Sequence, residues 1–245
     1  MTSPDRPTLD YQSQPPHSRA GRDDRAYIAP MAVFLAFVWA AGQWPKHYPL
    51  IYFVKAIVVT ILLAALWKHY TKIRWNHWWL GAIVGVVGIV QWVGMQLLLQ
   101  KLVIHIGEHT FTPFKPPPDP FDPFKAFSSA PWIWSWLVMR MATAALLVPV
   151  MEELFWRDFL WRTIIAPNDF KLAQVGEWDW KAFVGVCLFF ATVHGNWWLT
   201  SIVWAMMIGW LLVRTRSLGA CIVAHGVTNF LLAIYVLYTR DWAFW

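Results

Sequence analysis

The segment VMEELFWRDFLWR, residues 150–162, places charged side chains in a run that is otherwise strongly apolar. Glu153 and Arg157 are four residues apart, so on a helix they lie on one face and can pair. Glu152 points about 100° away from Glu153 around the helix and has no cation at helical spacing. Because a carboxylate in hydrocarbon is costly unless it is paired or hydrated, this position of Glu152 indicates a functional site.

Two further polar patterns follow in later apolar runs. His194 ends the pattern Phe-Ala-Thr-Val-His, and His225 precedes Asn229 by four residues, so that His225 and Asn229 share a helical face. Taken singly, such residues are often hydrogen-bond partners between membrane helices. Carboxylate, imidazole and amide groups on three separate spans nevertheless predict a polar chamber, in which a glutamate can act as a general base on water.

The composition indicates that this chamber lies in a membrane. Hydrophobic residues make up 58% of the chain and charged residues 14%, which is far from an average soluble domain. Many of the 20 tryptophans stand near the ends of apolar runs, where indoles favour the headgroup level. No soluble basic face with aromatic platforms is apparent, so we expect no nucleic-acid partner. Cys187 and Cys221 lie in apolar runs and indicate neither a disulfide scaffold nor a cysteine-pair zinc site.

The apolar runs predict an all-α fold, a polytopic membrane bundle of about seven to eight transmembrane helices, since about 20 apolar residues cross the hydrocarbon. The runs cover residues 28–44, 49–67, 79–100, 131–163, 182–195, 197–213 and 218–238. Residues 1–27 are polar and rich in proline and charge, which predicts a disordered tail. Residues 28–245 are predicted to form a single helical membrane domain. Lysine and arginine are concentrated in alternate loops, which places the amino terminus in the cytoplasm.

The long loop at about residues 103–130 contains TPFKPPPDPFDPFKAF, which predicts an extended external segment. We interpret it as a connector in preference to a lid or a docking strip for substrate. The loop opens with His105-Ile-Gly-Glu-His109, which matches the H-x-x-E-H pattern of some zinc proteases. Gly107 and the following Thr-Phe-Thr-Pro disfavour the helix that this zinc site needs, so we predict a polar turn at the membrane interface.

Several other polar residues fall inside apolar runs. Lys55 is expected to extend its ammonium group to the outer interface. Arg140 is deeper and either pairs with a carboxylate or reaches the outer interface. Gln91, Gln96 and Gln100 are expected to form hydrogen bonds to neighbouring helices rather than to bind a ligand.

The three polar patterns resemble, in residue type, order and spacing, the motifs of one known family. They are Glu152-Glu153-x-x-x-Arg157, Phe190-x-x-x-His194 and His225-x-x-x-Asn229. The family is the CPBP group of intramembrane glutamic endopeptidases, also called the Abi or type II CAAX prenyl protease family. The resemblance covers a core at about residues 131–238. EELFWRDFLWR also resembles the CAAX prenyl protease-related branch that accompanies exosortase sorting systems.

The resemblance implies peptide hydrolysis within the membrane without an obligatory metal or other cofactor. Glu152 would then be the general base on a water molecule that His194 holds, and His225 and Asn229 would stabilise the oxyanion. Glu153 and Arg157 would orient the helix, with Glu153 a second candidate for contact with the water. Carboxylate and imidazole groups also suit zinc, so a divalent metal is a minority alternative.

The implied substrate is a membrane-associated peptide or protein, of the lipidated CAAX type or with a sorting signal. Membrane lipid is the other expected partner. The resemblance and the lack of an organelle address suggest a cell membrane, the bacterial inner membrane. An alternative is a non-catalytic binding, immunity or scaffold protein that uses the same chamber. A proton-coupled transporter is a third hypothesis, which the lack of internal symmetry disfavours.

Overall fold

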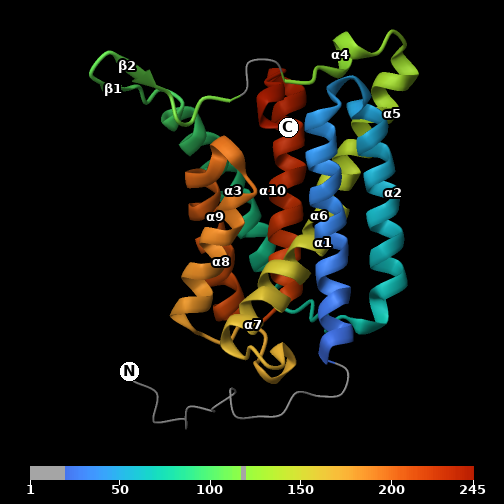
Figure 1. The fold of residues 1–245 in the computed structure, drawn as a ribbon, viewed down its shortest axis with the longest axis vertical. Coiled ribbons are helices and arrows are strands. Elements are labelled where there is room, and N and C mark those ends of the chain that lie inside the picture. Colours follow the sequence, from blue (N-terminus) through green and yellow to red (C-terminus); the bar gives the residue numbers. More distant parts are fainter. Residues whose placement is uncertain (1–19, 117–119) are drawn as a thin grey trace.

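The structure is a computed structural model that describes residues 20–116 and 120–245. It is a bundle of upright helices with a small two-stranded sheet at one end (Figure 1). Six segments of the described residues are long and apolar enough to cross a membrane, and α8 (Trp180–Thr192) is a shorter apolar helix. The predicted all-α membrane bundle is therefore confirmed, and each of the seven predicted apolar runs corresponds to one helical segment.

The first three upright helices are α1 (Ala20–Gln43), α2 (Tyr48–Leu66) and α3 (Trp78–Leu99). A long continuous helix follows, made of α5 (Ala130–Ala142), α6 (Val148–Glu153) and α7 (Trp161–Ile165), with π-helical turns between these parts. The chain then returns through α8, and α9 (Trp198–Thr215) and α10 (Leu218–Thr239) complete the bundle. The α10 helix lies at the centre of the ribbon view, between α9 and the α1–α2 pair (Figure 1).

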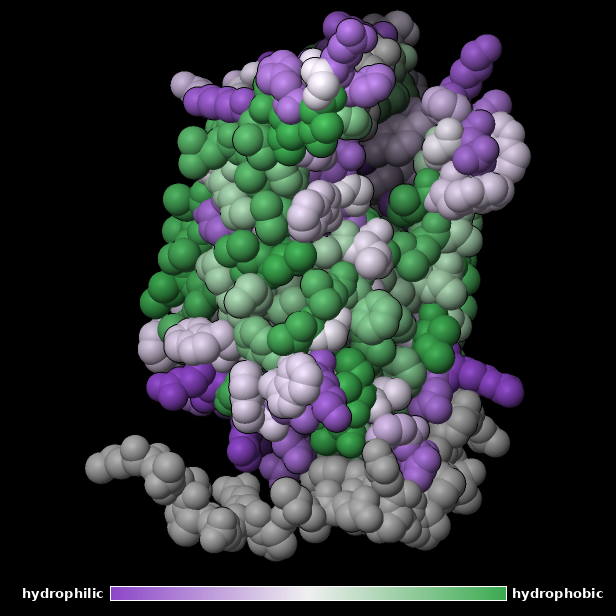
Figure 2. Space-filling view, turned by 60° about the vertical axis from the view of Figure 1, so that its left-hand side comes forward, coloured by the Kyte–Doolittle hydropathy of each residue, from purple (hydrophilic) through white to green (hydrophobic). Residues whose placement is uncertain are grey.

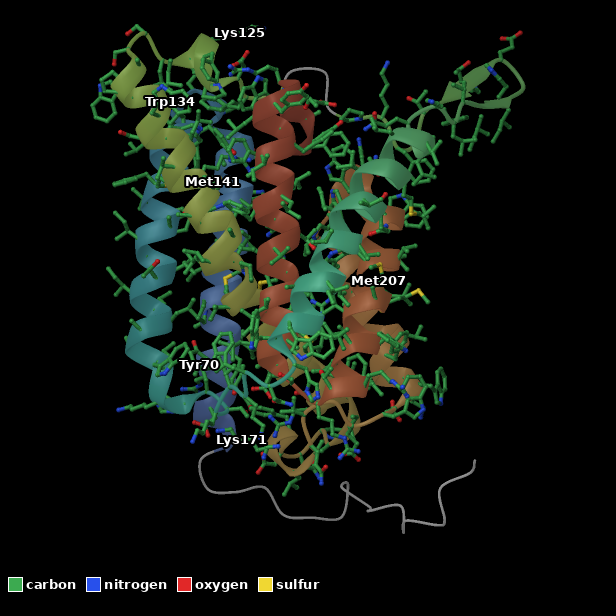
Figure 3. All side chains as sticks on the ribbon, turned by 180° about the vertical axis from the view of Figure 1, so that it is seen from behind. Tyr70, Lys125, Trp134, Met141, Lys171 and Met207 are labelled. Carbon is green, nitrogen blue, oxygen red and sulfur yellow. The ribbon has the colours of Figure 1, made fainter. Side chains whose placement is uncertain are left out.

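The two ends of the bundle are polar and its middle is apolar. Figure 2 shows that hydrophobic residues form the middle of this face, whereas hydrophilic residues gather toward both ends. Lys125 and Trp134 lie at one end, and Tyr70 and Lys171 lie at the other (Figure 3). The two groups of loops thus lie on opposite sides of the apolar band, as expected for a multi-pass membrane protein.

The sequence-based boundary of the amino-terminal tail is wrong by several residues. We predicted a disordered tail over 1–27, but helix α1 begins at Ala20; residues 1–19 lie outside the described part. Tyr27 is buried, and its hydroxyl donates to Asp158 Oδ2 at 2.8 Å. Asp23 pairs with Lys171 Nζ at 2.5 Å and with His69 Nδ1 at 2.8 Å. These contacts come from distant parts of the chain, so local composition could not predict them.

The segment with the H-x-x-E-H pattern forms an exposed β-hairpin, not a helix. Strands β1 (Ile104–Ile106) and β2 (His109–Phe111) pair antiparallel, with Ile104 opposite Phe111. Gly107 adopts a φ of 60°, a conformation that glycine tolerates best. The prediction of a turn is confirmed. The rest of the loop holds one short helix, α4 (Pro123–Ala126), and residues 117–119 lie outside the described part.

Helices α3 and α10 approach closely because glycines on α3 face the backbone of α10. A Cβ atom on Gly81 would lie 2.3 Å from the Ala220 carbonyl oxygen, and one on Gly85 would lie 2.6 Å from the Ala224 carbonyl oxygen. Thr228 Oγ1 donates to the Gly85 carbonyl at 3.0 Å. Small residues allow this kind of backbone contact in membrane helices. The contact fixes the rotation of α10, and with it the direction of the polar residues that α10 carries.

The glutamines of α3 behave as predicted at two of three positions. Gln91 Nε2 donates to the Thr200 carbonyl on α9 at 3.1 Å. Gln96 accepts from Thr200 Oγ1 at 2.6 Å and donates to the Phe114 carbonyl at 2.9 Å. Gln100 Nε2 is buried without a hydrogen-bond partner in the described part of the chain, so the prediction fails there.

The predictions for the two cations Lys55 and Arg140 are wrong. Lys55 does not extend to the interface but is buried, with Nζ 4.2 Å from the centroid of the Tyr52 ring. Arg140 is buried as well and donates to the Tyr48 hydroxyl, so it neither reaches the interface nor pairs with a carboxylate among the described residues. Aromatic rings surround both cations and hold them inside the bundle.

Candidate active site

The helix that carries both glutamates contains π-helical turns on either side of them. The first covers Thr143–Leu147 and the second Leu154–Leu160. Such turns are rare and occur frequently at functional sites, because they change the direction of side chains and release backbone groups from the helical pattern.

The first π-helical turn releases a carbonyl group that Asn229 binds. The Val148 N–H donates to the Thr143 carbonyl, five residues earlier. The next donor in this pattern would be residue 149, which is proline and has no N–H, so the Ala144 carbonyl has no donor from that pattern. Asn229 Nδ2 donates to this oxygen at 2.8 Å. Pro149 and the π-turn thereby attach α10 to the helix of the glutamates.

Glu153 forms the centre of a buried polar group. Its Oε1 lies 3.3 Å from Arg157 Nη1, as the spacing predicted, and 2.8 Å from His225 Nδ1 on α10. Both the glutamate and the arginine are fully buried. The guanidinium carbon lies 4.7 Å from the Phe190 ring centroid and 5.5 Å from the Trp204 ring centroid. An ion pair and two aromatic faces therefore hold Arg157 in place.

This buried group is not fully satisfied by hydrogen bonds. In the described part of the chain, Glu153 Oε2 and the Nε and Nη2 atoms of Arg157 have no hydrogen-bond partner. Buried polar atoms are nearly always bonded, and exceptions often mark sites that hold water or a ligand. The unsatisfied atoms thus set this group apart from a purely structural ion pair.

The two histidines have one ring nitrogen engaged and the other available. His194 Nδ1 lies 2.7 Å from the Phe190 carbonyl oxygen, which can only accept, so Nδ1 carries the proton. The Nε2 atom of the neutral His194 ring is then an acceptor. His225 Nδ1 donates to the Glu153 carboxylate in the same way. Each ring is held by its Nδ1 atom, which leaves Nε2 for contacts elsewhere.

A cavity of about 110 Å³ brings four of the six predicted site residues together. Glu152, His194, His225 and Asn229 line it. Glu152 is 7% exposed and, unlike Glu153, forms no hydrogen bond to another described residue. Glu153 and Arg157 do not line this cavity and lie behind His225. The cavity is large enough for water, and it is lined by a carboxylate, two imidazoles and an amide.

Sequence reasoning missed five residues of the cavity wall, which are Trp92, Val148, Trp204, Thr228 and Leu232. Trp204 packs its ring 4.7 Å from the His225 ring and donates through Nε1 to Thr228 Oγ1 at 3.4 Å. The Trp92 ring lies 5.8 Å from the His194 ring. With 20 tryptophans in the chain, tryptophan alone gives no signal for these positions.

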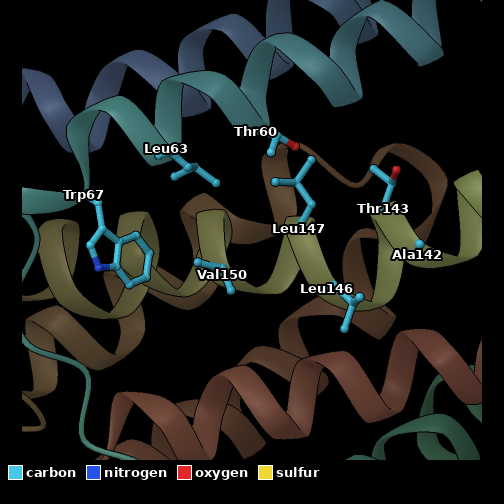
Figure 4. A pocket seen from close by; sticks show the side chains of 9 residues that line it. Thr60, Leu63, Trp67, Ala142, Thr143, Leu146, Leu147 and Val150 are labelled. Carbon is cyan, nitrogen blue, oxygen red and sulfur yellow. The ribbon is translucent and has the colours of Figure 1, made fainter.

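A larger apolar groove lies between α2 and the helix of the glutamates (Figure 4). It has a volume of about 450 Å³, and Leu63, Trp67, Leu147 and Val150 are among the residues that line it. No titratable side chain lines this groove, so it offers no acid–base chemistry.

Metal ligation requires several histidine, cysteine or acidic side chains close together. Within residues 20–116 and 120–245, no three His, Cys, Asp or Glu side chains are grouped so that they could hold a metal ion. His105 and His109 lie on the exposed strands β1 and β2, and His194 and His225 each use Nδ1 within the protein.

These features define a multi-pass helical membrane protein with a polar cavity between its helices. Residues 134–231 match the family described as type II CAAX prenyl endopeptidase Rce1-like, a family of CAAX-type intramembrane proteases. The matched segment contains all six predicted site residues. No curated protein and no solved structure matches the chain. The family prediction is confirmed, and the narrower resemblance to the exosortase-associated branch stays a prediction.

Proposed function

We propose that the protein is an intramembrane peptidase that hydrolyses a peptide bond of a membrane-associated substrate with water activated by Glu152. One observation carries this proposal: Glu152 lines a cavity between helices, forms no hydrogen bond to another described residue, and stands beside two histidines whose Nδ1 atoms are already engaged. A carboxylate that no ion pair occupies can act as a base.

In the proposed reaction, Glu152 takes a proton from a water molecule that His194 Nε2 holds by accepting a hydrogen bond. The water oxygen attacks the carbonyl carbon of the peptide and gives a tetrahedral oxyanion. Glu152 then gives the proton to the leaving nitrogen, and the C–N bond breaks. The products are a carboxylic acid and an amine, so atoms and protons balance without a further reactant.

Oxyanion stabilisation is assigned to α10. Asn229 uses one of its two amide hydrogens for the Ala144 carbonyl and keeps the other for the oxyanion. His225, when protonated, donates through Nε2 while its Nδ1–H remains bonded to Glu153. Hydrogen-bond donors that are fixed before the reaction stabilise the developing charge without a cost of reorganisation.

The proposal assigns different roles to the two glutamates. Glu153 Oε1 is engaged by Arg157 and His225, and the side chain is fully buried. A carboxylate held in this way positions His225 but is poorly placed to take a proton from water in the cavity. The geometry therefore favours Glu152 as the base and Glu153 as a positioning residue.

The proposed substrate is a membrane-associated peptide or protein of the lipidated CAAX type or with a sorting signal. We propose that it is cleaved in a cell membrane, the bacterial inner membrane. The loops that contain Tyr70 and Lys171 would face the cytoplasm, as would the amino terminus. The distribution of lysine and arginine between the loops supports this orientation. Lipid is the other proposed partner, and neither a metal cofactor nor nucleic acid is part of the proposal.

The test compares peptide termini in membranes of cells that carry the wild type or Glu152→Gln at matched protein levels. We expect a set of termini that appears only with the wild type. Glu108→Gln is the matched control, because Glu108 lies in the exposed turn between β1 and β2, far from the cavity in sequence. Identical termini in all three strains, with a deletion phenotype that Glu152→Gln rescues, would indicate a binding or scaffold protein instead.

A further inference from the structure

A cavity at the end of the bundle that contains Tyr70 (Figure 3) is lined by positive charge. It has a volume of about 790 Å³ and lies between the loop before α3, the loop between α7 and α8, and the turn between α9 and α10. Five cationic side chains line it, which are Lys72, Arg74, Arg162, Lys171 and Arg216. In the part of the chain that the structure describes, no acidic residue lines this cavity, and the cavity shares no residue with the one around Glu152.

Two of the five cations are already neutralised by carboxylates. Arg162 is 5% exposed and pairs with Asp158. Its Nε donates to the Ala173 carbonyl at 2.9 Å, and its Nη2 donates to the Lys171 carbonyl at 3.2 Å. Lys171 Nζ pairs with Asp23 at 2.5 Å. These bonds hold the loop between α7 and α8 against the bundle, so this part of the cavity wall is fixed.

The other three cations lack a counter-charge. Lys72, Arg74 and Arg216 form no ion pair with an acidic side chain among the described residues. Arg216 Nη1 donates to the neutral Gln174 Oε1 at 3.2 Å. The positive-inside rule explains why cations occur in these loops, but not why three of them line one cavity, where like charges repel. An anion in the cavity would remove this repulsion.

The backbone beside Arg74 is fixed by the start of α10. Ser217 Oγ lies 2.9 Å from the Arg74 carbonyl oxygen and 2.7 Å from the Asn76 carbonyl oxygen. The Gly219 N–H donates to the same Arg74 oxygen at 3.0 Å. A Cβ atom on Gly219 would lie 2.5 Å from this oxygen, so only glycine permits the contact. Backbone contacts between distant parts of the chain therefore bring the cations of two loops to one cavity.

Arg216 occupies a position at which glycine is the favoured residue. It caps the end of α9 with a φ of 50°, in the left-handed region. A side chain in this conformation is strained, and helices usually place glycine there. Arginine at this position keeps a guanidinium at the cavity in spite of the strain, which is typical of residues at binding sites.

The cavity lies at the level of the lipid headgroups. Arg216 directly follows the last residue of α9, and Leu218, also in the wall, is the first residue of α10. Trp75, Trp178 and Trp180, in or next to the loops that form the cavity, are exposed. Exposed indoles favour the membrane interface. A phosphate group of a lipid would therefore reach the cavity without leaving its own level in the membrane.

The cation types favour a phosphate that carries net negative charge. Two of the three unpaired cations are arginines, whose forked donors match phosphate oxygens. The same cations would repel the choline group of a zwitterionic lipid. Basic pockets between membrane helices on the cytoplasmic side are a typical place for anionic headgroups to bind.

We propose that the cavity lined by Lys72, Arg74 and Arg216 binds the phosphate group of an anionic phospholipid of the cytoplasmic leaflet. The acyl chains of this lipid lie along the apolar outer surface of the bundle. Because the lipid binds the assembled loops and not the unfolded chain, it also stabilises the fold. The inference goes beyond the proposed peptidase function and does not depend on it.

The experiment titrates the full-length protein in a neutral detergent with dioctanoyl phosphatidylglycerol or dioctanoyl phosphatidylcholine. The two lipids have the same acyl chains and differ in headgroup charge, and native mass spectrometry measures the concentration of each at half-saturation. We expect phosphatidylglycerol to reach half-saturation at a concentration about tenfold or more below that of phosphatidylcholine, because several cations contribute to its binding. Equal binding of the two lipids would overturn the proposal.

Arg216→Gly separates a ligand-binding role from a structural one. Glycine relieves the strained backbone, so the melting temperature without lipid should equal or exceed that of the wild type. The preference for phosphatidylglycerol should nevertheless fall by about fivefold, because one cation of the site is lost. An unchanged preference would contradict the assignment of this cavity.

Arg214→Gln is the matched control, because it removes one positive charge only two residues away. Arg214 is exposed in the last turn of α9 and does not line the cavity. This variant should keep the preference for phosphatidylglycerol. If it reduces the preference as much as Arg216→Gly does, the attraction is a general effect of surface charge and the proposed site is wrong.

Inorganic phosphate distinguishes a lipid from a soluble ligand of the same chemistry. Phosphatidylglycerol should raise the melting temperature of the wild type, whereas inorganic phosphate over the same concentration range should not. If inorganic phosphate raises it equally and Arg216→Gly abolishes both effects, the ligand is a soluble phosphate and the assignment to a lipid is wrong. Glu152→Gln should bind phosphatidylglycerol as the wild type does, so failure of the proposed catalysis and failure of this inference give different results.

Discussion

The helix that carries the glutamates repeats one local pattern with two different outcomes. Glu153 precedes Arg157 by four residues, and Asp158 precedes Arg162 by four residues. All four side chains are buried, and both pairs are on the same continuous helix. By sequence spacing alone the two pairs are equivalent.

The Asp158–Arg162 pair has a complete set of partners. Asp158 Oδ2 accepts from the Tyr27 hydroxyl at 2.8 Å. Arg162 Nε donates to the Ala173 carbonyl at 2.9 Å, and Nη1 donates to Thr71 Oγ1 at 3.0 Å. The partners come from the start of α1 and from the loops beside α7, which close around the pair. Such a network holds the end of the bundle together.

The Glu153–Arg157 pair is enclosed by aromatic rings and has fewer hydrogen bonds. Phe190 and Trp204 cover the guanidinium but offer it no acceptor atom. One carboxylate oxygen and two guanidinium nitrogens remain without a partner in the described chain. The two ion pairs have the same spacing but different surroundings. The Asp158–Arg162 pair joins the ends of helices and loops, whereas the Glu153–Arg157 pair also contacts a histidine, His225.

The largest effect on peptide cleavage should come from substitution of Glu152, which is next to the Glu153–Arg157 pair. We expect Glu152→Gln to reduce peptide cleavage by up to about 10⁴-fold, because a general base contributes this much and glutamine cannot take the proton. The melting temperature should stay close to that of the wild type. Cleavage of the substrate identified from membrane termini and thermal unfolding of the purified protein measure the two quantities. Substantial remaining cleavage would show that a residue other than Glu152 is the general base.

Breaking the complete pair should have the opposite profile. Asp158→Asn leaves the buried Arg162 guanidinium without its counter-charge, which we expect to lower the free energy of unfolding by about 3–5 kcal/mol. Cleavage per folded molecule should remain close to that of the wild type, since neither residue lines the cavity around Glu152. Chemical denaturation measures the free energy of unfolding, and activity normalised to the amount of folded protein measures the cleavage per folded molecule. A large loss of activity with normal stability would contradict this structural role.

A smaller effect on cleavage should follow from Glu153→Gln. The amide keeps the shape but loses the charge that holds His225 and Arg157, so we expect a loss of about 10–100-fold in kcat with little change in KM, as for removal of a group that orients a catalytic residue. The pH profile of cleavage should also change, which a merely structural role would not cause.

A double-mutant cycle tests whether Glu153 acts through its contact with His225. Glu153→Gln combined with His225→Gln should cost little more than His225→Gln alone, because the two residues act as one unit. Additive losses would show that Glu153 and His225 act independently, which would contradict the positioning role assigned to Glu153.

The smallest effect should come from removal of metal ions. If the cavity uses glutamate and water only, cleavage should stay within about twofold of the untreated level after incubation with a strong chelator. A metal held by carboxylate and imidazole ligands would instead be removed by the chelator, and cleavage would be lost. Loss of activity, with recovery on addition of zinc, would establish the minority metal mechanism. Thermal unfolding with and without chelator shows whether any loss is structural.

The sequence determined the relations that lie within single helices. The apolar runs located the seven apolar helical segments of the described residues, and helical spacing paired Glu153 with Arg157. These inferences hold because the period of a helix is fixed, so residues four apart meet wherever the helix lies. The three polar patterns and the family to which they point were readable in the same way.

Only the tertiary structure decided which neighbours each polar group has. In the tertiary structure, His225 contacts Glu153, whereas Glu152 lines the cavity. The Tyr27 hydroxyl donates to Asp158, and Lys55 is buried against the Phe34 ring. Each of these contacts joins residues on different helices, and it depends on how closely the helices approach and how they are rotated. Local spacing contains no information about either, so equal patterns at 153–157 and 158–162 acquire different roles.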